Sequence, residues 1–188
     1  MRTLTYYVAA SLDGFIAGPA GEVDAFSFEG ELRDVITSEL PETLPVHARA
    51  ALGIGDAPNR RFDTVVMGRG TYQPAIDAGI ASPYPHLEQV VVSRTLVVED
   101  PAVTVTDDPV ATVAALRERE GLGIWLAGGG RLAGALADHV DELVVKRNPV
   151  LLGAGVPLFD APYAMRAFRR VDTRVLEGGV VIESHVRA

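Results

Sequence analysis

Three arginines follow short apolar segments of the chain, where small residues accompany them. Arg69 and Arg131 each follow a glycine, and Arg94 follows a serine. A guanidinium group matches the oxygens of a phosphate, and glycine, serine and threonine supply further hydrogen-bond donors. Each arginine taken singly suits a surface position or an ion pair. Three of them at strand ends of an acidic chain favour a site for a ligand that carries several phosphates.

The stretch 123–134 (GIWLAGGGRLAG) combines an apolar run, three consecutive glycines and a second apolar segment at helical spacing. This pattern predicts a buried strand, a tight turn and the start of a helix. Glycines allow a backbone to approach a ligand closely, and the free N–H groups of a new helix attract anions. For a glycine run considered alone, a plain strand-to-helix turn is the alternative interpretation.

The glycines satisfy the loose dinucleotide pattern G-x-G-x-x-A between Gly128 and Ala133. In a Rossmann domain this turn belongs to the first βαβ unit and an acidic residue ends the next strand. Here the turn comes late, and Lys146 and Arg147 end the next predicted strand, so a Rossmann domain is disfavoured. No G-x-x-x-x-G-K-[ST] pattern occurs, which excludes a P-loop. Arginines in place of a ribose-binding acid suit a 2′-phosphate, and hence NADP rather than NAD.

Composition excludes several other classes of site. The chain has no cysteine, and its four histidines are scattered without an H-E-x-x-H pairing, so disulfides and thiolate sites are excluded and metal catalysis is disfavoured. The formal net charge of −8 argues against a nucleic-acid or anionic-membrane surface. Any anionic ligand must therefore be held by a local group of cations.

The length of 188 residues predicts one domain over 1–188. Residues 1–10 carry one basic residue and are followed by Ser11 and Asp13, which favours a first strand over a signal peptide. No apolar run approaches the length of a membrane span. We expect a soluble cytoplasmic protein.

Strand and helix patterns alternate along most of the chain. Strands are predicted at 3–10, 63–67, 90–92, 103–105, the start of the 123–134 stretch and 142–146, and a hairpin pairs 166–177 with 180–187. Helices are predicted within 22–40, from 43 to 53, after the turn at 68–72, from 108 onward and after the glycines. Thr71 is a candidate helix cap, and Arg60 and Arg61 are interpreted as a solvated pair.

This alternation predicts an α/β fold with three layers: a mostly parallel central sheet, helices on both faces and a C-terminal antiparallel hairpin. In such a sheet the loops that leave the carboxyl ends of parallel strands lie along one edge, where ligands bind. The three arginines are therefore expected at that edge.

Several ordered motifs resemble the dihydrofolate reductase-like superfamily. They are Ser11-Leu12-Asp13-Gly14, Val66-Met67-Gly68-Arg69 with Thr71-Tyr72, Val92-Ser93-Arg94, 126–131 and 149–159. The branch that they resemble most is the C-terminal reductase domain of the bifunctional riboflavin-biosynthesis deaminase/reductase. The motifs are weak singly, but their order over nearly the whole chain is specific.

This resemblance implies NADPH along the carboxyl edge of the sheet. By position, Gly68, Arg69 and Thr71 would hold phosphate at a helix start, and Ser93 and Arg94 would contact the 2′-phosphate. The segment Gly128, Gly129, Gly130, Arg131 and Leu132 would wrap the pyrophosphate, and the backbone of Ala9 and Ala10 would face the nicotinamide. A homodimer is also implied.

The chain departs from the relatives in ways that leave the substrate open. It has no zinc-deaminase H-x-E…P-C-x-x-C signature, and its only tryptophan, Trp125, is not beside an acid on the first helix. Asp13 and Glu31 are the candidate catalytic residues; Asp24 and Asp34 lie at a similar distance along the chain. A carboxylate there could orient a polar heterocycle or assist its protonation, and the alternative is a solvated acidic helix face.

These observations lead to two hypotheses. The first is an NADPH-dependent reductase of a small pyrimidine- or pterin-like heterocycle, with the cofactor supplying hydride and the protein supplying orientation. The second is a regulatory or scaffold protein of the same fold that binds NADP(H) without turnover. A purely structural module would require that Arg69 and Arg94 contribute to no ligand binding.

Overall fold

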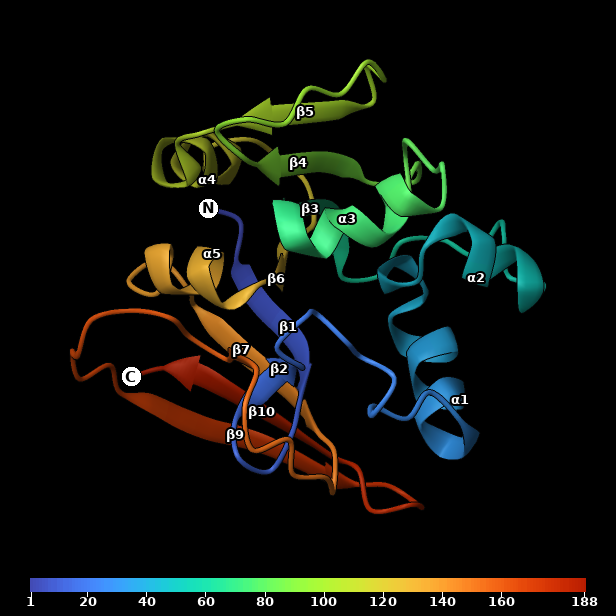
Figure 1. The fold of residues 1–188 in the computed structure, drawn as a ribbon, viewed down its shortest axis with the longest axis vertical. Helices are drawn as coiled ribbons and strands as arrows, with labels where there is room; N and C mark the ends of the chain where they lie inside the picture. Colours follow the sequence, from blue (N-terminus) through green and yellow to red (C-terminus); the bar gives the residue numbers. More distant parts are fainter.

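The computed structural model describes residues 1–188 and contains one large sheet (Figure 1). Its eight strands lie in the order β5-β4-β3-β6-β1-β7-β10-β9. The six strands from β5 to β7 are parallel, and β10 runs antiparallel to both β7 and β9. The strands are β1 Leu4–Ala10, β3 Phe62–Gly68, β4 Glu88–Val92, β5 Val103–Thr106, β6 Gly123–Gly128, β7 Glu142–Arg147, β9 Phe168–Val175 and β10 Val181–Arg187.

Helices cover both faces of this sheet. They are α1 Gly30–Glu39, α2 Val46–Ala51, α3 Arg69–Asp77, α4 Pro109–Arg117 and α5 Gly130–Ala135, with a short 3₁₀ turn at Pro41–Thr43. The predicted mostly parallel α/β fold with a C-terminal hairpin is thereby confirmed. No helix is long and apolar enough to cross a membrane.

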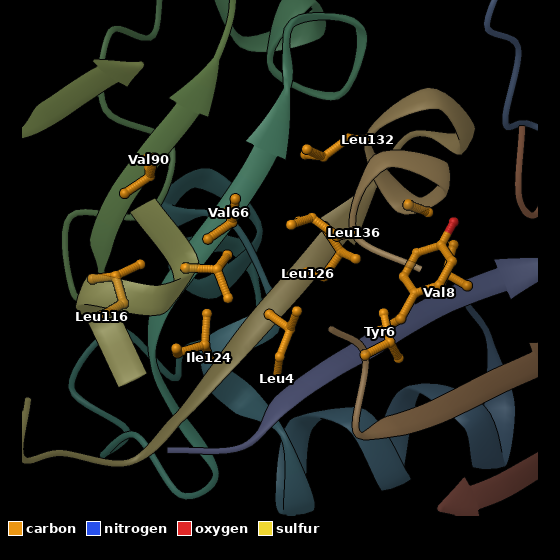
Figure 2. Close-up of a cluster of buried hydrophobic side chains, with 13 residues drawn as sticks. Leu4, Tyr6, Val8, Val66, Val90, Leu116, Ile124, Leu126, Leu132 and Leu136 are labelled. Atoms are coloured by element: carbon orange, nitrogen blue, oxygen red, sulfur yellow. The ribbon is translucent and has the colours of Figure 1, made fainter. Parts of the chain in front are cut away.

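The two faces of β1 explain why it lies in the middle of the sheet. Leu4, Tyr6 and Val8 point to the face covered by α4 and α5, where they join a core of thirteen buried residues (Figure 2). Tyr7 points to the other face and packs with Trp125 in a second core. Alternating side chains that are apolar on both faces are the pattern of a fully buried strand.

The third core cluster joins the C-terminal hairpin to the helix α1. Leu32 and Ile36 of α1 pack against Leu176 and Val180, which flank the hairpin turn. Ile182 of β10 packs against this cluster and against the core around Tyr7. The helix α1 therefore covers the sheet face that carries Tyr7, near the carboxyl end of β7.

A second, two-stranded sheet lies beside the end of β1. It pairs β2, Phe15–Ala17, with β8, Val156–Pro157, in antiparallel fashion. The turn-rich segment after β7 thereby packs against the turn that follows β1.

Three local predictions were wrong or incomplete. The helix predicted within 22–40 begins only at Gly30, and the next one begins at Val46. Thr71 is not a cap, because Gly68 occupies the N-cap position of α3. Arg61 is not a solvated residue, since its Nη2 lies 2.5 Å from Oε2 of Glu142, across the sheet.

Candidate cofactor and substrate site

Four neighbouring strands carry the predicted cofactor residues at their carboxyl ends. The strands β4, β3, β6 and β1 are consecutive in the sheet. Ser93 and Arg94 follow β4; Gly68 ends β3 and Arg69 begins α3; Gly128 ends β6; Ala9 and Ala10 end β1. The fold thus places residues from four distant parts of the sequence along one edge.

The junctions β3–α3 and β6–α5 are in contact with each other. A β-carbon at Gly68 would lie 3.5 Å from the carbonyl oxygen of Gly128 and 3.5 Å from the amide nitrogen of Gly129. The peptide between Gly128 and Gly129 is cis, and Gly128 has a φ of 111°, which favours glycine. Thr71 lies beside this glycine pair. The two glycine turns therefore form one continuous backbone surface.

Neither helix that starts here has a side-chain cap. Gly68 and Gly129 occupy the N-cap positions of α3 and α5, and neither helix has a side-chain hydrogen bond at its cap. The first N–H groups of a helix have no partner within the helix. At α3, a nine-residue helix, these donors remain available to an anionic ligand.

The three arginines at this edge carry few internal contacts. Arg69 donates a hydrogen bond from Nη1 to Oγ1 of Thr95 (2.9 Å), which joins α3 to the loop after β4. Arg94 is exposed and has neither a hydrogen bond nor a salt bridge. The Arg131 side chain is 95% exposed and lies 3.6 Å from the Asp160 carboxylate. All three guanidinium groups can turn toward a ligand.

Serine 93 shapes the loop that carries Arg94. Its hydroxyl accepts hydrogen bonds from the N–H groups of Thr95 (3.3 Å) and Leu96 (3.0 Å). The hydroxyl proton itself is not used in these two hydrogen bonds, so the Ser93 side chain can also donate to a phosphate oxygen.

The backbone of Ala9 and Ala10 is open on one side. Pairing between β1 and β6 ends at Tyr6, whereas pairing between β1 and β7 continues to Ala10. The last residues of β1 therefore have a neighbouring strand only on the β7 side. The carbonyl of Ala10 accepts a hydrogen bond from Asn148 N–H (2.8 Å). The end of β1 is thus held firmly while its β6 side can face a ligand.

Asp13 is fixed as a hydrogen-bond acceptor. Its carboxylate accepts the Ser11 hydroxyl (2.6 Å) and the N–H groups of Leu152 (3.2 Å) and Gly153 (2.7 Å). These hydrogen bonds lower the pKa of Asp13 to about 2, and the bond from Ser11 contributes most. An ionised carboxylate that ties two loops together suits a structural role better than proton donation.

Glu31 lies apart from the cofactor residues. It is exposed in the first turn of α1 and accepts the N–H of Glu177 in the hairpin turn (2.8 Å). Asp34 is also exposed and faces Arg33. The structure therefore does not bring the two predicted acids, Asp13 and Glu31, into the set of glycines and arginines.

Lys146 lies beside the end of β1 and was not among the site residues predicted from the sequence. It pairs in register with Ala9, and its Nζ lies 4.0 Å from the centroid of the Tyr7 ring. Burial lowers the pKa of Lys146 to about 8. The available signal was composition, because Lys146 is the only lysine in a chain with many arginines.

The fold is that of a dihydrofolate reductase-like α/β protein. The model of the RibD C-terminal domain family matches residues 2–182. The chain therefore belongs to the RibD C-terminal domain family.

Relatives and solved structures agree with this family. The uncharacterized protein YwjB of Bacillus subtilis is 32% identical over 163 residues, covering 84% of this chain and 83% of that protein. A putative riboflavin biosynthesis protein from Shewanella sp. PV-4 superposes with a TM-score of 0.73 at 25% identity, covering 100% of this chain and 99% of that one.

Two more distant structures share the fold. A deaminase/5-amino-6-(5-phosphoribosylamino)uracil reductase from Thermotoga maritima has a TM-score of 0.66 at 15% identity, over 100% of this chain and 57% of that longer one. Dihydrofolate reductase from Enterococcus faecalis, complexed with NADP(H), has a TM-score of 0.67 at 15% identity, covering 98% and 96%. Both comparisons show that this chain shares its fold with these two proteins.

Proposed function

We propose that this protein is an NADPH-dependent reductase of a small pyrimidine- or pterin-like heterocycle. The observation that carries the proposal is the row of glycine turns and weakly engaged arginines at the ends of β4, β3 and β6. The names of the structural neighbours support the same chemistry, since one reduces a uracil derivative and the other is a dihydrofolate reductase with NADP(H).

The residues at this edge fit the phosphates of NADPH. Arg94 and Ser93 offer a guanidinium group and a hydroxyl to the 2′-phosphate. Arg69 contacts the same loop, because its Nη1 donates a hydrogen bond to Thr95. The glycine pair at 128–129 and the uncapped start of α3 offer backbone N–H groups to the pyrophosphate. Bound NADPH would supply a hydride, while the protein would bind and orient both reactants.

Titration of the purified protein with NADPH, followed by nicotinamide fluorescence, tests the proposal directly. We expect saturable binding of NADPH and weaker binding of NADH, because only NADPH has the 2′-phosphate that Arg94 and Ser93 would contact. An absence of binding at high micromolar NADPH would refute the proposal.

A second function is favoured by the hydrogen bonds of the two predicted catalytic acids. Asp13 is held ionised by its hydrogen bonds and Glu31 lies in the hairpin contact, so neither is placed as a proton donor. An NADP(H)-binding regulatory or scaffold protein needs no such group. Oxidation of NADPH with dihydrofolate or aminouracil substrates, followed at 340 nm, would exclude this alternative.

The implied homodimer remains a prediction. Light scattering at several protein concentrations would give the mass in solution, to be compared with the 20.0 kDa of one chain.

A further inference from the structure

Lys146 lies at the end of β7, on the sheet face that α1 covers. Its register partners are Ala9 on β1 and Ile182 on β10, and Ile182 packs against the cluster that contains α1. Lys146 therefore lies next to the end of β1, where the nicotinamide is predicted to bind. Arg147, the next residue, points to the opposite face and pairs with Glu183 at 2.8 Å.

No anionic group of the protein neutralises Lys146. It forms no salt bridge and its ammonium donates no hydrogen bond; its contact is with the Tyr7 ring. The phenol of Tyr7 is itself kept neutral, because burial raises its pKa above the ordinary value. Tyr7 therefore offers an aromatic face and not a negative charge.

Two carboxylates, Glu39 and Glu42, lie close enough to Tyr7 to act electrostatically on its phenol. Glu39 pairs with Arg174 at 2.7 Å. Glu42 accepts the N–H groups of Arg61 (2.7 Å) and Phe62 (2.9 Å) through Oε1; its Oε2 is buried without a hydrogen-bond partner and forms no salt bridge with Lys146. The charged groups around Tyr7 and Lys146 thus leave the ammonium without a partner.

A largely desolvated ammonium without a counter-charge destabilises a fold. The sequence uses arginine at every other cationic position, and arginine is the usual choice for ion pairs. Lysine differs by presenting a compact charge whose pKa responds to burial. A single lysine, kept partly buried and unpaired beside a ligand site, indicates a role toward the ligand.

We propose that the ammonium of Lys146 is the substrate-binding cation of this site, donating hydrogen bonds to a carbonyl or deprotonated lactam oxygen of the heterocycle held beside Ala9. This inference rests on the proposed reductase function and adds to it the polar group that the substrate must present. The Tyr7 ring forms a cation–π contact with the ammonium. The oxygen of the substrate supplies the negative charge that the protein does not.

Chemical labelling gives a first test, because Lys146 and the amino terminus are the only amines of the chain. The native protein is treated with limiting acetic anhydride from pH 6 to 10, and the Lys146 peptide is quantified by mass spectrometry. We expect labelling with a midpoint near pH 8. Saturating 7,8-dihydrofolate or 5,6-diaminouracil, with NADP⁺ present, should slow it at least about tenfold. A lysine that labels only after denaturation, or that neither probe protects, would contradict the inference.

Two variants separate this inference from the proposed function. Lys146→Met keeps the length of the apolar stem and removes the charge. It should raise the Tm and keep the wild-type affinity for NADPH, yet weaken binding of the same two probes at least about tenfold, the equivalent of 1.4 kcal/mol. Arg147→Gln is the matched control, since it removes a cation at the same strand end but on the opposite face, and should leave probe binding unchanged.

The outcomes are distinguishable. Wild-type binding of NADPH with undiminished probe binding by Lys146→Met would overturn the role of Lys146 alone. Failure of the wild-type protein to bind NADPH would refute the reductase proposal itself. Binding of NADPH with no binding of either probe to the wild-type protein would refute the heterocycle class and the assignment of Lys146 together.

Discussion

The two edges of the central sheet use arginine in opposite ways. At the amino edge, where the parallel strands begin, Arg2 contacts Asp63 and Arg117 contacts Asp141. Arg61 completes this set through Glu142 at the start of β7. At the carboxyl edge, Arg69 bonds to the neutral hydroxyl of Thr95, and Arg94 has no partner. Arg131 has only a long contact with the Asp160 carboxylate.

The difference separates arginines that form ion pairs within the protein from arginines whose charge is free to bind a ligand. At the amino edge, the pairs Arg2–Asp63 and Arg61–Glu142 join the starts of different strands, and Arg117–Asp141 joins the end of α4 to the residue before β7. Arg69, Arg94 and Arg131 are brought to the carboxyl edge by strand order and backbone turns without a close ion pair, whereas Arg147, at the end of β7, is paired with Glu183. In a protein with a net charge of −8, this leaves one region that attracts a phosphorylated ligand.

The largest effect on stability is expected from Arg2→Met. The Arg2 side chain is only 4% exposed, contacts Asp63, and bonds to Thr64 Oγ1 (2.7 Å) and the Leu122 carbonyl (2.6 Å). Its removal leaves a carboxylate without its partner, so the free energy of unfolding should fall by about 3 kcal/mol. Urea denaturation measures this change. NADPH affinity should be unaffected, and a parallel loss of both would break the distinction between the edges.

The double variant Arg69→Ala/Arg94→Ala should have the reverse effect. Each guanidinium contact to a phosphate contributes about 1.5–3 kcal/mol, so NADPH affinity should fall about 100-fold or more. The free energy of unfolding should change little, because both side chains are exposed. Fluorescence titration gives the affinities. Arg119→Ala is the control, an exposed arginine paired with Glu88 at the amino edge, and should bind NADPH normally.

Local sequence patterns predict most of the fold because they act over a few residues. Asp108 caps α4 by accepting Ala111 N–H at 2.9 Å, as an acidic residue before proline predicts. The turn at Gly178 and Gly179 joins β9 to β10, as predicted from its glycines. The start of α1 was not predictable, because residues 22–29 are acidic like the helix and lack a cap signal at Glu29.

The sequence predicts which residues of the site lie at strand ends, but it does not predict which side chains contact one another there. The alternation of strands and helices predicts parallel strands, whose carboxyl ends share one edge, so Arg69 and Arg94 could be expected at that edge. Which carboxylate meets which cation depends on residues far apart in the chain, such as Arg61 and Glu142. The isolation of Lys146 is equally non-local, because Glu39, which acts on the same Tyr7 ring, is paired with Arg174 far along the chain.

A smaller effect is expected from Gly134→Ala in α5. A β-carbon there would overlap the carbonyl oxygen of Asp160, whose backbone N–H donates to Gly130 at 3.0 Å. Overpacking of this kind should lower the free energy of unfolding by about 1–3 kcal/mol and weaken NADPH binding slightly by shifting α5. Urea denaturation and the NADPH titration measure both changes. Gly70→Ala in α3, where a β-carbon meets no atom within 4 Å, is the control and should stabilise by up to about 1 kcal/mol.

The smallest effect concerns Asp13, a carboxylate at the carboxyl edge that serves the fold. Asp13 accepts three hydrogen bonds, which lower its pKa from the unfolded value of 3.8 to about 2. Its stabilisation is therefore fully present above pH 4 and is lost as the pH falls through 2. Asp13→Asn should lower the Tm at pH 6, and the difference from wild type should shrink between pH 4 and pH 2. Thermal unfolding monitored by circular dichroism measures this difference in Tm.

Asp24→Asn is the control for this prediction. It changes an exposed carboxylate without a partner and should show no such pH dependence. A difference that stayed constant down to pH 2 would mean that the ionised form of Asp13 is not what ties the turn after β1 to the loop at 152–153.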